Sequence, residues 1–332
     1  MDAKQTIAVS APAKVHLLGE HTVVYGKPAL LATVDLRTTV TLTPSVIARS
    51  RATKQSKQEI ATLASVARSD DVETIQQIIE QIVKKELKIK FIPNYKVEIS
   101  SQIPTGCHLG SSAAISAAYI AALLTFLKVR WDLNLVNKLA YEGEKVFHGS
   151  PSGGDNSTVV FGGLVWFRKE TPDLKIIQKL PFSIPNKLSK NFVLINTGTP
   201  NKTTKQMIEK VSSNFKIQSE KFKKIFDNQE QLVRDLLLAI KEGNENELIQ
   251  IIKLGEKNLE KIGVCSPEVK KIIRQIEKLG GAAKICGAGA SEGPTGILLC
   301  YHSDPKIIKN IANYYNLSYF KTALGVEGLR KE

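Results

Sequence analysis

The stretch IPTGCHLGSSAA, residues 103–114, places two glycines and a pair of serines directly before the apolar, alanine-rich segment ISAAYIAALLTFL. This order predicts a turn followed by a helix near 111–128. Serine is a good N-cap and glycine allows a tight turn, so helix capping alone explains the pattern. A loop of this kind at a helix N-terminus also binds phosphate. These twelve residues fit both interpretations equally well, and the rest of the chain has to decide between them.

The composition is that of an ordinary globular protein. With 332 residues, 42% of them hydrophobic and 23% charged, the chain is long enough for one large or two ordinary domains. No apolar run reaches the roughly 18 residues of a membrane-spanning helix, and the N-terminus lacks the apolar core of a signal peptide. Four widely spaced cysteines without a CxxC pair indicate neither a disulfide framework nor a zinc site. We therefore expect a reduced, cytoplasmic protein without a membrane partner.

The chain is basic, with 46 Lys and Arg against 32 Asp and Glu, and a net charge of +14. Much of this excess is mixed with glutamates along helical segments such as KIQSEKFKKIF, which is typical of solvated helix faces. The sequence contains no RNP-type aromatic platform, zinc finger or basic region. Nucleic acid is therefore not expected as a partner, and the positive charge suits ATP and a small anionic substrate equally well.

Periodicity indicates a mixed α and β chain. Alternating, β-branched segments predict strands before residue 45, in YKVEISSQIP, GGLVWFR and FVLINTG, and near the C-terminus in AAKICGAG, TGILLCYH and LSYFKTAL. Apolar residues three and four apart predict helices at 72–90, 132–147, within 203–262 and at 266–279. A shift to helix-rich composition near 180–200 suggests that a second domain begins there.

Three further segments concentrate small or charged residues. APAKVHLLGEHTVVYG, residues 11–26, brings Lys14, Glu20 and His21 together on a strand, turn and strand. EGEKVFHGSPSGGDNSTVVFGG, residues 142–163, places Glu144 on a helix and Asp155 in a turn rich in Gly, Ser and Pro. KICGAGASEGPTG, residues 284–296, is a glycine-dense loop between two strands. Taken singly, each segment also fits an ordinary exposed turn or helix exit.

Together these segments resemble the mevalonate kinases, a group within the superfamily of galactokinases, homoserine kinases, mevalonate kinases and phosphomevalonate kinases (GHMP kinases). PAKVHLLGEHTVVYG is similar to the family's first motif, PTGCHLGSSAA to its ATP-phosphate motif, and HGSPSGGDN to the segment of its catalytic aspartate. KICGAG is similar to the start of the last glycine loop, and INTGTPNKTTKQMI to a further family segment. The matches run from residue 7 to about 300, and the combination of GEH, VVYG and HGSPSGGDN favours the mevalonate kinases over their relatives.

The resemblance implies an α+β fold of two domains with the active site in the cleft between them. Residues 1–185 would form an N-terminal domain like ribosomal S5 domain 2, and residues 186–332 a C-terminal ferredoxin-like domain. The segment 45–71 is unlike the family's usual strand continuation and looks like a translated interspersed repeat, so we expect a peripheral insertion. An ordinary family helix of unusual composition is the alternative.

The activity implied by the resemblance is transfer of the ATP γ-phosphoryl group to the primary C5 hydroxyl of (R)-mevalonate, a step of isoprenoid precursor synthesis. ATP and mevalonate would be the partners and Mg²⁺ the cofactor, while a homodimer stays an open possibility. The alternatives are phosphomevalonate kinase, another small-molecule kinase of the superfamily, or a catalytically idle member that senses a ligand. Retention of Lys14, Glu144 and Asp155 argues against the idle member.

The catalytic roles also follow from the resemblance. Asp155 would lie by the substrate hydroxyl as general base or electrostatic orienter, and Lys14, paired with it, would offset charge on the transferring phosphoryl group. Ser112 and Glu144 would bind Mg²⁺, a hard cation held by few protein oxygens and the ATP phosphates.

The binding residues are assigned in the same way. Glu20 and His21 would line the mevalonate pocket, and Thr203 would face the active site. The ATP-binding residues come from two glycine-containing loops. They are Pro104, Gly106, Gly110, Ser111 and Ser112 in the first loop, and Gly287 and Gly289 in the last.

Two departures from the family pattern concern the nucleotide site. His108 stands where relatives usually have glycine, and a histidine takes a positive φ only with some strain. In the last loop, residues 290–295 replace a run of glycines and place Glu292 near the expected phosphates. Both changes put ATP affinity in question more than the reaction. Replacing His108 by glycine is predicted to leave the KM for ATP unchanged or lower.

Overall fold

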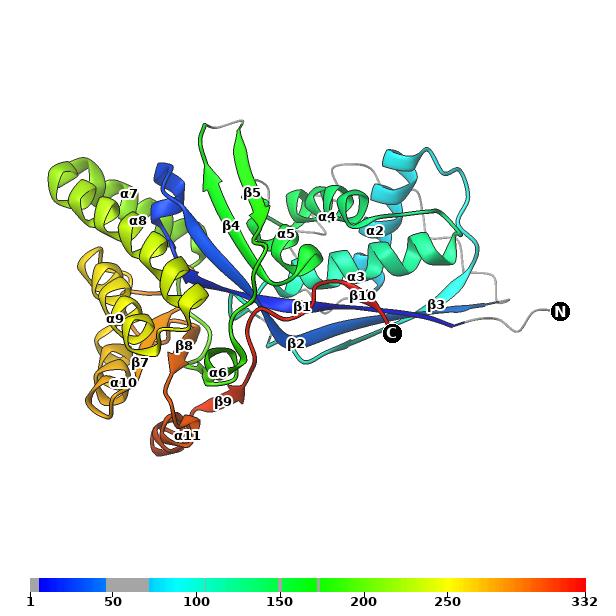
Figure 1. The fold of residues 1–332 in the computed structure, drawn as a ribbon. Coiled ribbons are helices and arrows are strands. Elements are labelled where there is room, and N and C mark those ends of the chain that lie inside the picture. The colour runs from blue at the N-terminus through cyan, green and yellow to red at the C-terminus, as the bar shows by residue number, and fades with distance from the viewer. Residues whose placement is uncertain (1–5, 46–71, 105, 149–150, 172–173) are drawn as a thin grey trace.

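The computed structural model describes residues 6–45, 72–104, 106–148, 151–171 and 174–332. The predicted insertion at 45–71 lies outside the described residues except for Ser45, so its role stays a prediction. Two lobes lie side by side, one built around each of two antiparallel sheets (Figure 1). The predicted α+β fold with two domains is confirmed.

The first lobe is built on a six-stranded antiparallel sheet. Its central strand β2 is 16 residues long and pairs with β1 along most of its length, with β3 near its end and with β4 near its start. β10 extends the sheet beyond β1, and β5 extends it beyond β4. The strands are β1 (Ile7–Leu18), β2 (Ala29–Pro44), β3 (Tyr95–Ser101), β4 (Leu164–Lys169), β5 (Lys175–Lys179) and β10 (Arg330–Lys331).

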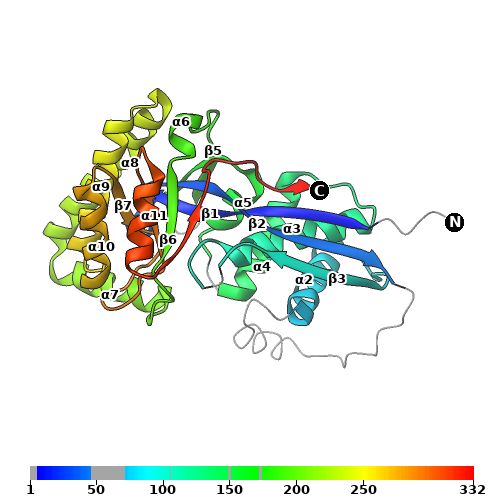
Figure 2. The ribbon, with the colours of Figure 1, turned by 90° about the horizontal axis from the view of Figure 1, so that it is seen from below.

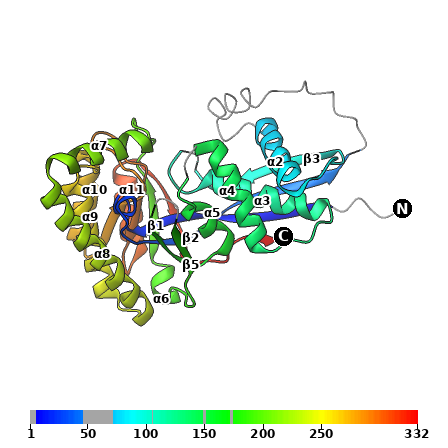
Figure 3. The ribbon, with the colours of Figure 1, turned by 90° about the horizontal axis from the view of Figure 1, so that it is seen from above.

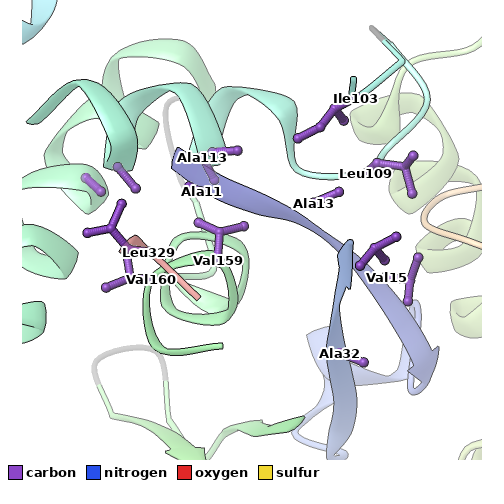
Figure 4. Close-up of a cluster of buried hydrophobic side chains, with 14 of the residues drawn as sticks. Ala11, Ala13, Val15, Ala32, Ile103, Leu109, Ala113, Val159, Val160 and Leu329 are labelled. Atoms are coloured by element: carbon purple, nitrogen blue, oxygen red, sulfur yellow. The ribbon is translucent and has the colours of Figure 1, made fainter. Parts of the chain in front are cut away.

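Helices of the first lobe cover one face of this sheet (Figure 3). They are α2 (Val72–Leu87), α3 (Ser111–Phe126), α4 (Leu133–His148) and α5 (Gly154–Phe161). The alanine-rich α3 is buried along most of its length, because it packs on β1 and β2 and is covered by α4. Ala11 and Ala13 of β1, Ala113 of α3 and Val159 of α5 point into one cluster (Figure 4). The small side chains let helix and sheet approach closely.

The second lobe contains a four-stranded sheet in the order β7-β8-β6-β9. The first of these strands along the chain therefore lies between the third and the fourth, which is the ferredoxin-like arrangement. The strands are β6 (Phe192–Asn196), β7 (Ala282–Ile285), β8 (Ile297–Tyr301) and β9 (Ser318–Lys321). The helices of this half of the chain are α6 (Asn186–Ser189), α7 (Thr204–Ile217), α8 (Ser219–Glu242), α9 (Glu245–Lys261), α10 (Pro267–Lys278) and α11 (Pro305–Tyr314).

The tip between β1 and β2 enters the second lobe. It contains a short 3-10 helix, η1 (Thr22–Tyr25), and the Tyr25 ring packs 4.9 Å from the ring of Phe215 and 4.7 Å from that of Phe226. Leu18 of β1 packs directly on Gly255 of α9. A Cβ added to Gly255 would lie only 2.3 Å from Cδ2 of Leu18. Residues of the first motif are therefore held by both lobes.

The C-terminal tail returns to the first sheet, where Val9 of β1 pairs with Lys331 of β10 (Figure 2). The last residues of the chain therefore belong to the sheet of the first lobe. The predicted division of the chain into domains at 185/186 stays a prediction. No helix in the described part of the chain has the length and hydrophobicity needed to cross a bilayer.

Candidate active site

The loop predicted to bind the ATP phosphates, called the phosphate loop below, covers residues 103–112. It lies between β3 and the first turn of α3, and it is attached to β1. Gly110 is the N-cap of α3 with a φ of 75°, and a Cβ there would lie 2.8 Å from Cγ of Lys14. Only glycine suits this position, because it needs both the left-handed conformation and the space. The Lys14 backbone N–H also donates to the Leu109 carbonyl at 2.9 Å. Ser111 and Ser112 begin the helix, where backbone N–H groups are available to an anion.

An ion pair joins β1, the strand to which this loop is attached, to α5. The Lys14 ammonium lies 2.9 Å from Oδ1 of Asp155; the lysine side chain is 4% exposed and the aspartate 35%. The sequence predicted Asp155 in a turn, whereas the structure places it in the first turn of α5, after the N-cap Gly153. The positive end of the helix dipole favours a carboxylate there. Asp155 is thus a fixed carboxylate that a substrate can reach.

Glu144 of α4 lies close to this pair and is buried. Burial raises the pKa of its carboxyl to about 7, the charge of Asp155 adds to the increase, and a side-chain hydrogen bond to Ser112 works against it. A divalent cation would relieve both the burial cost and the repulsion between the two carboxylates. The Glu144 carboxylate and the Ser112 hydroxyl are hard oxygen donors, so they fit Mg²⁺.

Glu20 and His21 lie at the tip of the first sheet, against the last glycine loop. His21 has a φ of 59° and is buried, and its Nε2 lies 3.0 Å from the carbonyl oxygen of Ala288. Burial lowers the pKa of His21 to about 4, so the ring is neutral at pH 7 and donates to that carbonyl. Glu20 forms an ion pair with Lys284 of β7. The first motif and the last loop, predicted separately, therefore meet.

Two residues of this region were not predicted as site residues. His16 places Nδ1 3.4 Å from Nζ of Lys14. Burial, followed by the charge of Lys14, holds the pKa of His16 well below its ordinary value, so the ring is neutral. Lys284 is fully buried. The sequence could have indicated both residues. His16 lies two residues after Lys14 on a strand, so the two side chains share one face of the sheet. Lys284 is a charged residue within an otherwise apolar strand.

His108 takes the left-handed conformation expected from its position, with a φ of 62°. A Cβ on Gly287 would lie 2.8 Å from the His108 Cβ, so the histidine packs against the start of the last glycine loop. Its Nδ1 is 3.5 Å from Oγ1 of Thr204 in α7. The side chain thus connects its own loop to the last glycine loop and to the start of α7.

The binding roles of the remaining predicted residues stay predictions. Thr203 is the exposed N-cap of α7, and it forms a capping box with Gln206. A Cβ on Gly289 would lie 2.1 Å from the Val264 carbonyl oxygen, so packing alone requires glycine there. Pro104 and Gly106 lie in the loop before α3, and Gly106 is exposed.

Three sequence profiles match the chain. The profile described as "GHMP kinases N terminal domain" matches residues 73–163, and "GHMP kinases C terminal" matches residues 236–316. The profile "Galactokinase galactose-binding signature" matches residues 1–44, which contain β1, its tip and β2.

Individual proteins match over most of the chain. The mevalonate kinase of Archaeoglobus fulgidus is 31% identical over 280 residues, which cover 84% of this chain and 88% of that protein. The mevalonate kinase of Thermococcus onnurineus is 30% identical, covering 85% of this chain and 86% of that protein. The crystal structure of Methanococcus jannaschii mevalonate kinase superposes with a TM-score of 0.78 over 97% of this chain and 99% of that one, at 22% identity.

Proposed function

The chain belongs to the GHMP kinases, which are ATP-dependent small-molecule kinases, and we propose that its substrate is (R)-mevalonate. The product would be 5-phosphomevalonate, a precursor in isoprenoid synthesis. The observation that carries the phosphoryl-transfer reaction is the Lys14–Asp155 pair, 2.9 Å apart and attached to the phosphate loop through Leu109 and Gly110. An acceptor hydroxyl beside Asp155 would then lie next to the phosphates of ATP.

The geometry supports in-line phosphoryl transfer. As the acceptor oxygen forms its bond to the γ-phosphorus and the bond to ADP breaks, Asp155 accepts the hydroxyl proton or orients it. Lys14 offsets the negative charge on the transferring group and holds the aspartate in place. The N-terminus of α3 binds the phosphates through backbone N–H groups. Ser112 and Glu144 would hold Mg²⁺, which neutralises phosphate charge when it is bound.

The choice of mevalonate rests on the relatives and on the first motif. The matched proteins of Archaeoglobus fulgidus and Thermococcus onnurineus are mevalonate kinases, and they match most of the chain. A sugar is the second candidate, because the galactokinase signature matches residues 1–44. Both candidates present a hydroxyl acceptor, so the reaction would be the same and only the pocket would differ.

A coupled ADP-release assay distinguishes the acceptors. We expect kcat/KM for mevalonate to exceed that for phosphomevalonate, galactose and homoserine at least tenfold. Faster turnover of galactose would move the assignment to the sugar kinases, and equal or faster turnover of phosphomevalonate would also overturn it. The Asp155→Asn protein is the control, because it identifies ADP release that does not depend on this site.

A further inference from the structure

The turn directly before Asp155, residues 151–154, sets where α5 begins. Gly153 is the N-cap of the helix with a φ of 90°, and the backbone N–H of Gly154 donates to Oγ of Ser152 at 3.1 Å. Glycine and serine alone leave the backbone of such a turn free to take many conformations. A carboxylate that acts on a reacting hydroxyl needs a fixed position, because small displacements cost rate. Neighbouring elements therefore have to hold this turn.

β5 holds the turn through Lys175. Its ammonium donates to the carbonyl oxygen of Pro151 at 3.2 Å and to the hydroxyl oxygen of Tyr141 in α4 at 3.1 Å. The Tyr141 hydroxyl lies 3.4 Å from the same carbonyl oxygen, so it supports the bond from the other side. The ammonium, the hydroxyl and the carbonyl form a closed triangle, which ties the turn to both α4 and β5.

Side chains of the same two elements pack on Gly153. A Cβ added there would lie 3.3 Å from Cδ1 of Ile177 in β5 and 3.5 Å from Cε2 of Tyr141. The Lys175 ammonium also lies 5.2 Å from the centre of the Tyr141 ring, which is a cation–π contact. Because Lys175 and Ile177 are two residues apart on a strand, their side chains share one face of the sheet. This face of β5 therefore packs on the turn that leads into Asp155.

A second lysine of β5 provides a comparison. Lys179 donates to the carbonyl oxygen of Phe161, the last residue of α5, at 2.8 Å. A cation is expected at the C-terminal end of a helix, because it complements the helix dipole. At the N-terminal end, where Lys175 bonds to Pro151, the same dipole disfavours a cation. The contact of Lys175 therefore needs another reason, and the residue that distinguishes this end of α5 is Asp155.

We propose that Lys175 is a positioning residue for phosphoryl transfer. Together with the Tyr141 hydroxyl it fixes the turn of residues 151–154, and so holds the Asp155 carboxylate where it acts on the acceptor hydroxyl. This inference rests on the proposed kinase function, since Lys175 acts through Asp155. Its loss should lower kcat and leave both KM values almost unchanged, because the triangle belongs to α4, β5 and this turn and not to the phosphate loop.

Three variants test the proposal in the coupled ADP-release assay with (R)-mevalonate. We expect Lys175→Met to lower kcat roughly three- to tenfold, the scale of one or two hydrogen bonds, with both KM values within about twofold of wild type. Lys175→Arg keeps the charge and the N–H donors, so it should recover most of kcat. Tyr141→Phe keeps the ring against Gly153 and loses only the hydroxyl, so its effect should be the smaller one.

The Asp155→Asn background separates positioning from general support. If Lys175 acts through the Asp155 carboxylate, adding Lys175→Met to Asp155→Asn lowers kcat no further, whereas an independent contribution would multiply. Lys179→Met is the matched control, because it loses a lysine-to-carbonyl bond at the other end of the same helix. We expect it to lower the melting temperature at least as much as Lys175→Met does, with kcat within about twofold of wild type.

Four results would overturn the proposal. They are a wild-type kcat in folded Lys175→Met, an equal loss of kcat in Lys179→Met, a fully multiplied loss in the Asp155→Asn background, and failure of both Lys175→Met and Tyr141→Phe to fold. Circular dichroism and melting temperatures establish the fold of each variant. If the wild-type protein phosphorylates another acceptor, only the substrate assignment fails, and the variants are compared with that acceptor. If it phosphorylates none of the four, the kinase function fails and this inference with it.

Discussion

Two lysine–carboxylate pairs touch His16, and they differ in how far water and substrate reach them. In the first, Asp155 is 35% exposed and Lys14 is 4% exposed. In the second, Glu20 and Lys284 are 2% and 0% exposed. Lys14 meets the imidazole of His16, whereas Lys284 meets its backbone carbonyl. The same chemical pair therefore occurs once at the open side of the site and once in its sealed interior.

The difference in exposure divides the roles. A base or an orienting group has to contact the reacting atoms, so its carboxylate must remain reachable, as Asp155 is. A positioning group works better when it is sealed, because low dielectric strengthens its bonds and fixes its geometry. We therefore expect changes to the open pair to act on kcat and changes to the sealed pair to act on stability.

The largest effect is expected for Asp155→Asn. The amide keeps the size of the side chain but accepts no proton and gives Lys14 no anionic partner. We expect kcat to fall by roughly 10²–10⁴, the usual range for a general base, with both KM values within several-fold of wild type. Steady-state kinetics measures this, and circular dichroism confirms the fold. A folded variant with nearly wild-type kcat would remove Asp155 from the mechanism.

Lys14→Met tests whether the open pair acts as a unit. The thioether fills the space of the lysine stem against Gly110 but carries no charge. We expect a loss of kcat similar to that of Asp155→Asn, because each variant breaks the same 2.9 Å pair. In the double variant the losses should be far less than multiplicative, as they are for residues that work together. Fully multiplicative losses would mean that Lys14 and Asp155 contribute independently.

The sequence predicted both residues of the open pair, Lys14 and Asp155, but only Glu20 of the sealed pair. Lys14 and Asp155 lie in motifs that resemble a known family, and the strand and helix positions follow from hydrophobic periodicity. Lys284 gave a weaker signal, since a lysine in an apolar strand does not reveal its partner 264 residues earlier. The return of β10 to β1 was equally hidden, because two residues form no periodic pattern. Long-range pairing depends on packing, and one sequence does not specify it.

A buried carboxyl outside both pairs extends the comparison, because Glu256 forms no ion pair with any residue that the structure describes. It is 0% exposed on α9, and its Oε2 accepts from the backbone N–H of Ile285 at 2.9 Å. Burial raises the pKa of Glu256 to about 8. The folded state therefore keeps a proton that the unfolded state loses above about pH 4.5, the ordinary value. Its contribution to stability falls as pH rises between these two values, by up to about 1.4 kcal/mol per pH unit.

Glu256→Gln measures this contribution. The amide oxygen still accepts from Ile285 but does not ionise. Relative to the variant, the wild-type protein should lose on the order of a few kcal/mol of unfolding free energy between pH 5 and pH 8, with little further change below the lower pKa. Urea denaturation at several pH values gives the difference and cancels the titration of groups common to both proteins. A constant difference across this range would show that Glu256 ionises in the same range in both states.

The smallest effect is expected for His108→Gly, where two terms oppose each other. Glycine relieves the strain of a φ of 62°, worth on the order of 1 kcal/mol, but it loses the packing on Gly287 and makes the phosphate loop more flexible.

Lys128 supplies the matched control, because it has a φ of 57° and is exposed, so Lys128→Gly relieves similar strain without this packing. We expect Lys128→Gly to be neutral or stabilising, and His108→Gly to be less stable than that control by about 1 kcal/mol, with the KM for ATP unchanged or lower. Thermal unfolding of both variants and ATP titrations at saturating acceptor measure these terms separately. A large rise in the KM for ATP would mean that the imidazole binds the nucleotide, so that the histidine in the phosphate loop is a ligand as well as a packing residue.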